Sequence, residues 1–199
     1  MRADAMERHR RLLDAGREII SERGADVPLA AVAQLAGVGI GTLYRHFPAR
    51  TDFTSAVMAD VLDRTLLELT AIHSAVAEYP CAALQLMTRS LVQLRLGTLI
   101  GRQLAHNASV PDNLQVQRNQ VIKDIACALD NLKAAGEVRV DLTADEYLII
   151  VGALTQTWHA THGKKTVDTT GSSFDRILDI FVAGTRPGRR TMGRSLPMP

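Results

Sequence analysis

Aromatic residues are scarce in this chain, which has three Tyr, four Phe and one Trp among 199 residues. Alanine and leucine abound instead, and hydrophobic residues make up 46% of the chain. Aromatic residues favour strands, whereas Ala and Leu favour helices, so this balance predicts an all-α fold. The apolar share can form a sizeable core in one larger domain or two small ones.

Long apolar runs and cysteines are also missing or rare. No stretch approaches 18 uninterrupted apolar residues, so we expect no membrane span. The charged segment 8–11 leads into no apolar stretch of the secretory type. Cys81 and Cys127 lie far apart in helical patterns, and we interpret them as buried free thiols, with a redox-switch pair as the alternative. A reduced, cytoplasmic location fits this pattern.

Neither sign of charge dominates, but the charges are unevenly distributed. Residues 1–50 contain 8 basic and 6 acidic residues, and residues 51–185 contain 11 basic and 15 acidic ones. Residues 186–199 add four Arg and no acid, and their many Pro and Gly residues predict a disordered tail. A weakly acidic middle is a poor surface for nucleic acid, whereas the basic N-terminal region suits phosphate.

The most informative segment is residues 28–50, where one short helical pattern leads through a glycine turn into another. Four apolar residues of the first pattern fall at helical spacing: Leu29, Val32, Ala33 and Ala36. Gly37 follows where a helix ends and a left-handed residue is easiest, and Val38 supplies an apolar residue in the turn. The segment therefore predicts a helix, a turn and a second helix.

In the second helix, Leu43 and Phe47 are four residues apart and can share one buried face. The residues left off that face, wholly or partly, are Ile40, Gly41, Thr42, Tyr44, Arg45 and His46. Pro48 ends the helix, and Arg50 falls in the first turn of the next one, where free N–H groups attract anions. This is the pattern of a helix-turn-helix, whose second helix enters a DNA major groove. The alternative is a helical hairpin without a ligand.

This segment resembles the DNA-binding domain of the TetR family of one-component regulators. The matching strings are Ala36-Gly37-Val38, Gly41-Thr42-Leu43-Tyr44 and His46-Phe47-Pro48, followed by the basic Arg50. The resemblance covers residues 6–70. It implies that Ile40, Gly41 and Arg45 face DNA bases, and that Thr42, Tyr44, His46 and Arg50 hold the DNA backbone.

Two residues depart from the family pattern. Gly39 stands where the family usually has Ser or Thr to cap the second helix and touch phosphate. Pro28 stands where a Thr often begins the first helix. Asp26 can cap that helix instead, with Val27 and Pro28 entering it. Near the chain start, Arg8, Arg10 and Arg11 either reach phosphate or form a solvated face.

Helical patterns continue through the rest of the chain. We expect helices over residues 6–23, 49–78, 112–135, 144–162 and 173–183, and one long or two shorter helices over 81–107 with Gly97 and Gly101 as weak points. Thr143 and Glu146 form a predicted capping box, and residues 163–172 a loop. The predicted domains are a three-helix DNA-binding head (1–50), a helical effector-binding and dimerisation body (51–185) and the basic tail (186–199).

The resemblance further implies a homodimer in which the last two helices of each subunit form a four-helix bundle. The dimer residues predicted on this basis are Leu148, Gly152, Thr155, His159, Ile177, Leu178 and Phe181. A dimer would place two recognition helices about one DNA turn apart, roughly 34 Å, to read a palindrome.

The resemblance also implies a small-molecule effector bound in the body. The candidate polar contacts are Arg95, Gln103, Gln120, Gln156 and His159, and the candidate apolar walls are Met87, Leu91 and Trp158. Each has a structural alternative, because Met87, Leu91 and Trp158 can be core residues and Arg95 can form an ion pair.

An enzyme is disfavoured by the motifs that are missing. His106, His159 and His162 have no Cys or carboxylate pattern that completes a zinc site. There is no phosphate-binding glycine loop after a strand and no Ser-centred elbow. We therefore predict no catalysis, metal or cofactor. The predicted function is a ligand-responsive regulator, commonly a repressor, on palindromic operator DNA; the alternative is a helical adaptor for protein contacts.

Overall fold

All regular secondary structure in the residues that the structure describes is helical. This computed structural model describes residues 2–23, 27–96, 112–162 and 173–188, and no strand occurs in these ranges. The helices are α1 (Arg2–Arg23), α2 (Leu29–Leu35), α3 (Ile40–His46), α4 (Arg50–Glu78), α5 (Pro80–Gln93), α7 (Asp112–Ala134), α8 (Ala144–His162) and α9 (Ser173–Thr185). The predicted all-α fold is confirmed.

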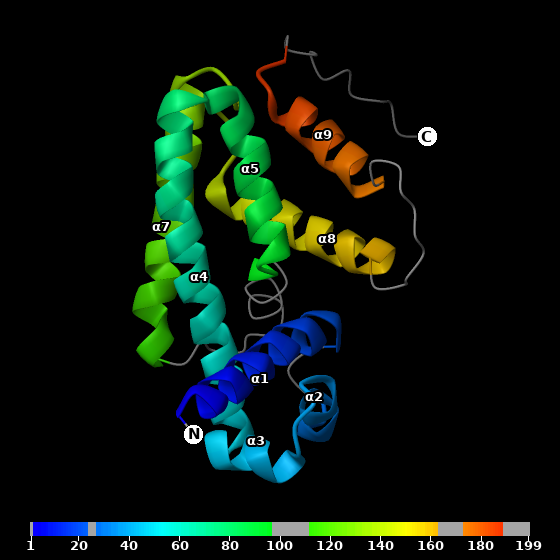
Figure 1. Cartoon of the computed structure of the whole chain (residues 1–199). Helices are drawn as coiled ribbons and strands as arrows, with labels where there is room; N and C mark the ends of the chain where they lie inside the picture. Colours follow the sequence, from blue (N-terminus) through cyan, green and yellow to red (C-terminus); the bar gives the residue numbers. More distant parts are fainter. Residues whose placement is uncertain (1, 24–26, 97–111, 163–172, 189–199) are drawn as a thin grey trace, which may run out of the picture.

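Helices α1, α2 and α3 form a small unit around the first turns of α4 (Figure 1). Leu12 of α1, Val32 of α2, Leu43 of α3 and Phe53 of α4 are fully buried at its centre, and Phe47 packs edge-on against Phe53. These are the apolar positions that helical periodicity selects, so the head follows from local sequence patterns.

Helices α1 and α4 lie close together at Gly16. A Cβ atom at this position would lie 2.6 Å from the ring of Phe53 and 2.6 Å from a methyl group of Val57. Both of these side chains are fully buried. The missing side chain at Gly16 therefore allows α1 to pack directly on α4.

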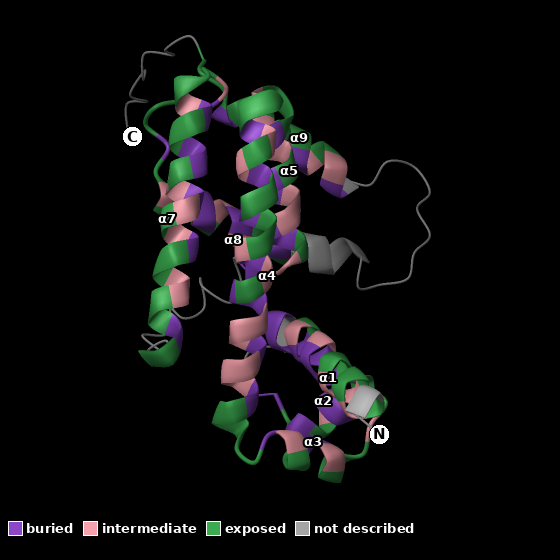
Figure 2. Ribbon diagram, turned by 60° about the vertical axis from the view of Figure 1, so that its left-hand side comes forward, coloured by how far each residue is buried: buried purple, intermediate pink, exposed green. Residues whose placement is uncertain are grey.

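Helix α4 runs from the head into the body, where it packs against α5 and α7 (Figure 1). Helix α8 packs against α5 and α7, and α9 packs against α5 and α8. Figure 2 shows the buried residues along the faces that these helices turn towards one another. Leu69 and Ile72 of α4 lie in this core with Ile125 and Leu129 of α7.

Several helix ends agree with the predicted signals. Tyr79 is the only residue between α4 and α5, and Pro80 begins α5. Gly136 ends α7 with a φ of +75°, and the N–H of Glu137 donates to the carbonyl of Leu132. The capping box of α8 is also present: the N–H of Glu146 donates to Oγ1 of Thr143, while the N–H of Thr143 donates to the Glu146 carboxylate, and this bond lowers the pKa of Glu146.

One predicted helix start is wrong, and of the two alternatives for residues 81–107 the single long helix is wrong. Helix α2 begins at Leu29 with Pro28 in the N-cap position, so Val27 and Pro28 do not enter it; Asp26 lies outside the described residues. Helix α5 ends at Gln93, before Gly97, and the backbone at Arg95 is left-handed. A non-glycine residue in that conformation gives no sequence signal of its own. Gly97 and Gly101 lie outside the described residues.

The two cysteines also differ from the expectation. Cys81 and Cys127 are both free and both exposed, rather than buried. Each lies on the outer side of an amphipathic helix, because the larger apolar residues of α5 and α7 already fill the core. Among the described residues, no helix is both long and apolar enough to cross a membrane.

Candidate nucleic-acid interface

Helix α3 has one buried side and one open side. Leu43 and Phe47 are buried, as the four-residue spacing predicts. Ile40 is 42% exposed and Tyr44 is 50% exposed. Gly41 and Arg45 are exposed as well, and Thr42 and His46 are half-buried. The structure thus brings the six predicted DNA-facing residues of α3 together on one accessible surface.

The turn before α3 is built around Gly37, which has a φ of +65°. The N–H of Gly37 donates to the carbonyl of Gln34, and the N–H of Val38 donates to that of Ala33 at 3.0 Å. These two bonds close α2 in the way that a left-handed glycine permits. Val38 packs against the head core, as predicted. The turn therefore sets the angle between α2 and α3.

His46 has a partner that the sequence analysis did not select. The ring of His9, on α1, lies 5.6 Å from the ring of His46 and 5.2 Å from that of Phe47, measured between centroids. These contacts hold the end of α3 against α1. In the sequence, the only signal for His9 is its position in the helical periodicity of α1, and this pattern does not show which residue His9 contacts.

Arg50 is the first residue of α4, and its side chain is exposed. Its Nη1 donates to the carbonyl oxygen of Val27 at 2.6 Å. Arg50 therefore ties the start of α4 to the segment before α2. Its predicted contact with a DNA phosphate stays a prediction.

The arginines near the start of α1 are partly engaged within that helix. Nε of Arg8 donates to the carbonyl of Asp4, and Arg10 pairs with Glu7 and Asp14. The pairing with Arg10 lowers the pKa of Glu7. Arg11 is exposed. Of the two interpretations of these arginines, a solvent-exposed face rather than a phosphate contact describes Arg8 and Arg10 well.

At the N-terminus of α3, Gly39 occupies the N-cap position with an extended backbone and no side-chain cap. A Cβ atom at Gly39 would meet nothing within 4 Å. We expect Gly39→Ser to stabilise the chain by a few tenths of a kcal/mol, because a hydroxyl can accept a hydrogen bond from the free N–H groups. We also expect tighter binding to duplex DNA, since the same hydroxyl can donate to a phosphate.

Thermal unfolding and fluorescence anisotropy with a labelled duplex would measure these two effects. Gly188→Ser is the matched control, because Gly188 is also unobstructed and lies beyond α9. A Gly39→Ser variant that binds DNA more weakly than wild type would contradict the placement of this N-terminus at the DNA.

The predicted effector residues that the structure describes lie in different surroundings. Met87 and Leu91 are fully buried in the body, which suits either a core or an apolar wall. Gln120 is exposed and donates to Asp124 on the outside of α7, and its predicted contact with an effector stays a prediction. Gln156 is exposed too. Gln103 and the side chains of Trp158 and His159 lie outside what the structure describes.

Arg95 is placed against α1 rather than towards the inside of the body. Its Nη1 donates to the carbonyl of Glu18 at 3.2 Å and to Oγ of Ser21. Arg95 thus lies at the junction of head and body, and its predicted contact with an effector stays a prediction.

The interior of the body contains a polar pair that the sequence analysis missed. The hydroxyl of Tyr147 on α8 lies 3.0 Å from Oγ1 of Thr88 on α5, and both side chains are fully buried. Thr88 Oγ1 donates to the carbonyl of Leu84, so Tyr147 must donate to Thr88. Burial raises the pKa of Tyr147, which keeps the phenol neutral.

The predicted dimer residues are mostly buried within one subunit. Leu148, Thr155 and Leu178 have almost no exposed surface within one subunit, and their place in a dimer interface stays a prediction. Gly152, Ile177 and Phe181 are half-buried, and the ring of Phe181 lies 6.3 Å from that of Tyr147. The side chain of His159 is outside the described residues.

The open faces of α8 and α9 carry other apolar residues. Ile149 of α8 is 68% exposed, and Ile180 of α9 is 70% exposed. Ala153 and Ala183 are exposed on the same two helices. Helical periodicity alone does not distinguish this face from the buried one, and only the packing of the folded chain separates the two.

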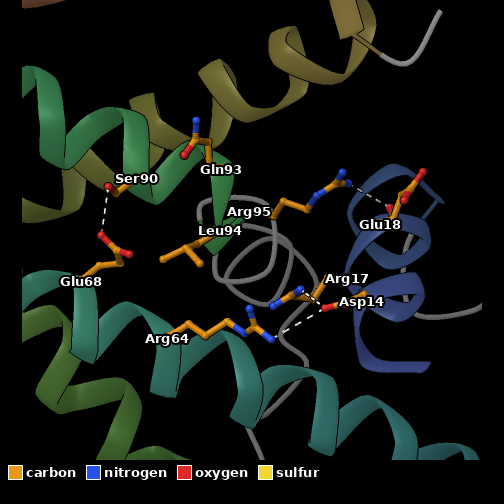
Figure 3. Close-up of a pocket in the computed structure, with 9 residues that line it drawn as sticks. All are labelled: Asp14, Arg17, Glu18, Arg64, Glu68, Ser90, Gln93, Leu94 and Arg95. Carbon is orange, nitrogen blue, oxygen red and sulfur yellow. Dashed lines mark hydrogen bonds and ion pairs between the residues drawn. The ribbon is translucent and has the colours of Figure 1, made fainter. Parts of the chain in front are cut away.

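A hollow of about 370 Å³ lies where the head meets the body. Figure 3 shows charged side chains from three elements around it: Asp14, Arg17 and Glu18 of α1, Arg64 and Glu68 of α4, and Arg95 beyond α5. The described residues contain no group of three or more His, Cys, Asp or Glu side chains that could hold a metal ion.

The N-terminal part of the chain matches a known family. Residues 12–57 match the model described as bacterial regulatory proteins, tetR family. A curated relative, an HTH-type transcriptional regulator of Staphylococcus aureus, is 33% identical over 69 residues, which are 35% of this chain and 34% of that protein. The chain thus spans about a third of the curated relative's length. The curated relative and the family model are both named as regulators and not as enzymes.

Solved structures resemble almost the whole chain. A TetR transcriptional regulator from Streptomyces coelicolor is 26% identical with a TM-score of 0.55, covering 90% of this chain and 98% of that one. A TetR regulatory protein from Mycobacterium vanbaalenii has 23% identity and a TM-score of 0.57, covering 94% and 99%. The regulator LfrR from Mycobacterium smegmatis, solved with proflavine, has 20% identity and a TM-score of 0.59, covering 90% and 94%.

Proposed function

Because this chain belongs to the TetR family of bacterial regulatory proteins, we propose that it regulates transcription by placing α3 in the major groove of duplex DNA. The observation that carries this proposal is the open side of α3, where Ile40, Gly41, Tyr44 and Arg45 are exposed together beside a buried Leu43. An exposed apolar and aromatic surface with a basic residue suits base edges and phosphates.

The proposed contacts divide by chemistry. Ile40, Gly41 and Arg45 would face bases, because an aliphatic group can contact the thymine methyl and a guanidinium can pair with guanine. The hydroxyls of Thr42 and Tyr44 and the ring of His46 would donate to phosphates. Arg50 would add charge at the start of α4.

The test is a selection of bound duplexes from a random DNA pool, followed by affinity measurements over a range of salt concentrations. A regulator enriches a common sequence with two related half-sites, and its affinity falls steeply with salt. An adaptor for protein contacts enriches no sequence and binds DNA weakly even at low salt. That second result would overturn the proposal.

The proposed DNA-bound form is a homodimer held by α8 and α9. Support comes from the exposed apolar residues Ile149 and Ile180 on these two adjacent helices. Apolar side chains this exposed are best explained by a partner surface when they occur on neighbouring elements. The dimer gives the two copies of α3 the spacing that a palindromic operator requires.

Introducing a charge at this surface tests the dimer. We expect Ile180→Asp to convert the protein to a monomer and to weaken binding to a palindromic duplex by about 10-fold or more, because each subunit then binds one half-site alone. Light scattering after size-exclusion chromatography measures the mass. Val116→Asp, at a strongly exposed position on α7, is the matched control. A variant that stays dimeric would place the subunit contact elsewhere.

The proposed signal is a small molecule that binds in the body and causes the protein to dissociate from the DNA. Met87 and Leu91 would be apolar walls, and the buried Thr88–Tyr147 pair is close by on α5 and α8. Support also comes from LfrR, a structurally similar regulator that was solved in complex with proflavine. We further propose that the protein represses transcription while it is bound to DNA and that the effector relieves this repression. Its proposed location is the cytoplasm, where the chain would meet DNA.

A further inference from the structure

Three helices of the described chain end in a residue with a left-handed backbone. Gly37 follows α2 with a φ of +65°, Gly136 follows α7 with a φ of +75°, and Arg95 follows α5 with a φ of +63°. Glycine is the usual residue in this place because any side chain adds steric strain there. Arg95 is therefore in a position where the chain elsewhere uses glycine.

The side chain of Arg95 makes contacts that glycine cannot make. Its Nη1 donates to the carbonyl oxygen of Glu18 and to Oγ of Ser21, both on α1. Ser21 is buried and donates its own proton to the carbonyl of Glu18, while its oxygen accepts from Arg95. Leu96 is fully buried directly after Arg95 and anchors the backbone on the body side.

A second link joins α1 to the middle of α4. Nη1 of Arg17 lies 2.7 Å from Asp60, and Arg17 also pairs with Asp14 on its own helix. Arg64 bridges Asp60 at 3.0 Å and Asp14 at 3.7 Å. Asp14, Arg17 and Arg64 line the same hollow as Arg95 (Figure 3). Helix α1 is thus held by α4 on one side and by the end of α5 on the other.

We propose that Arg95 is a positioning residue, which fixes the angle of the DNA-binding head against the body by tying α1 to the end of α5. Strain in a backbone persists only where other contacts compensate for it, and here they are the bonds to Glu18 and Ser21. A shift of the buried α5 would then move α1 directly, in addition to any effect through α4. The consequence for DNA rests on the proposed function, but the geometry can be tested without DNA.

The test compares Arg95→Gly with wild type by the distance between two spin labels in one chain. Labels at Gln34→Cys on α2 and Val116→Cys on α7 report the head and the body, because both positions are exposed. Cys81 and Cys127 are first changed to Ser. Labelled chains are diluted with an excess of unlabelled, cysteine-free chains, so that each assembly holds one labelled chain.

We expect Arg95→Gly to widen the distance distribution by about twofold, because the head loses one of its two links. Its melting temperature should stay equal to or rise above the wild-type value, since glycine relieves the strain at a φ of +63°. A purely structural role of Arg95 would instead lower the melting temperature and leave the distances narrow in the folded protein. An unchanged distribution would overturn the proposal.

Two further variants separate the link from other effects at the hollow. Ser21→Ala removes an acceptor of Arg95 and should widen the distribution in the same direction. Ser90→Ala is its matched control, because Ser90 lines the same hollow but donates to Glu68 of α4 within the body. Equal widening in both variants would contradict a specific link. If the wild-type chain binds no duplex, the proposed function fails while the distances still decide the role of Arg95.

Discussion

Gly16→Val is expected to destabilise the DNA-binding head by about 3 kcal/mol and to lower the melting temperature by roughly 10 °C. The first added carbon would lie 2.6 Å from both Phe53 and Val57, far inside van der Waals contact. Both side chains are fully buried, so moving either of them would disturb the surrounding core. Helix α1 must therefore separate from α4, and the core around Leu12 and Phe53 opens.

Thermal unfolding followed by circular dichroism measures this effect, and Gly184→Val is the matched control. Gly184 lies near the end of α9, and a Cβ atom added there would meet nothing within 4 Å, so the same substitution should change stability by about 0.5 kcal/mol. Gly16→Ala should fall between wild type and Gly16→Val, because better helix propensity offsets part of the overlap. A Gly16→Val protein as stable as wild type would show that α1 and α4 pack differently.

Tyr44→Ala is expected to weaken binding to the selected duplex by about 10- to 100-fold, which is the value of one hydrogen bond to a charged phosphate. The side chain is half-exposed on α3 and packs little against the head, so we expect no change in thermal stability. This combination of lost binding and retained fold distinguishes a contact residue from a core residue.

The matched control for Tyr44→Ala is Tyr79→Ala, which removes another exposed tyrosine at the junction of α4 and α5. Both variants are compared by gel shift and by anisotropy at several salt concentrations. The slope of affinity against salt should be the same for Tyr44→Ala as for wild type, because no cation is lost. Equal weakening by the two substitutions would remove the reason to place α3 at the DNA.

The helix-turn-helix could be predicted from sequence because its determinants are local. Gly37 ends α2, Pro48 ends α3, and the spacing of Leu43 and Phe47 defines the buried face, all within 20 residues. Each of these signals acts through the conformation of its own residue or through neighbours on the same helix. The capping box at Thr143 and the glycine after α7 were predictable for the same reason.

The faces of the body helices could not be assigned in this way. An α8 with apolar residues on several sides offers both Leu148 and Ile149 as candidates for a partner surface, and periodicity does not say which neighbour covers which side. Packing of α8 against α5, α7 and α9 buries Leu148 and leaves Ile149 open. The same holds for Leu178 and Ile180 on α9, and for the exposed Cys81 and Cys127.

By itself, then, the sequence determined the helical fold, the helix-turn-helix and the residues that α3 exposes, because these depend on contacts between residues a few positions apart. Only the tertiary structure decided where Arg95 points, which residues of α8 and α9 remain exposed, and how closely α1 crosses α4 at Gly16. Arg95 contacts residues 74 and 77 positions earlier in the chain. Pairings over such distances are selected by the packing of whole helices, which no local pattern specifies.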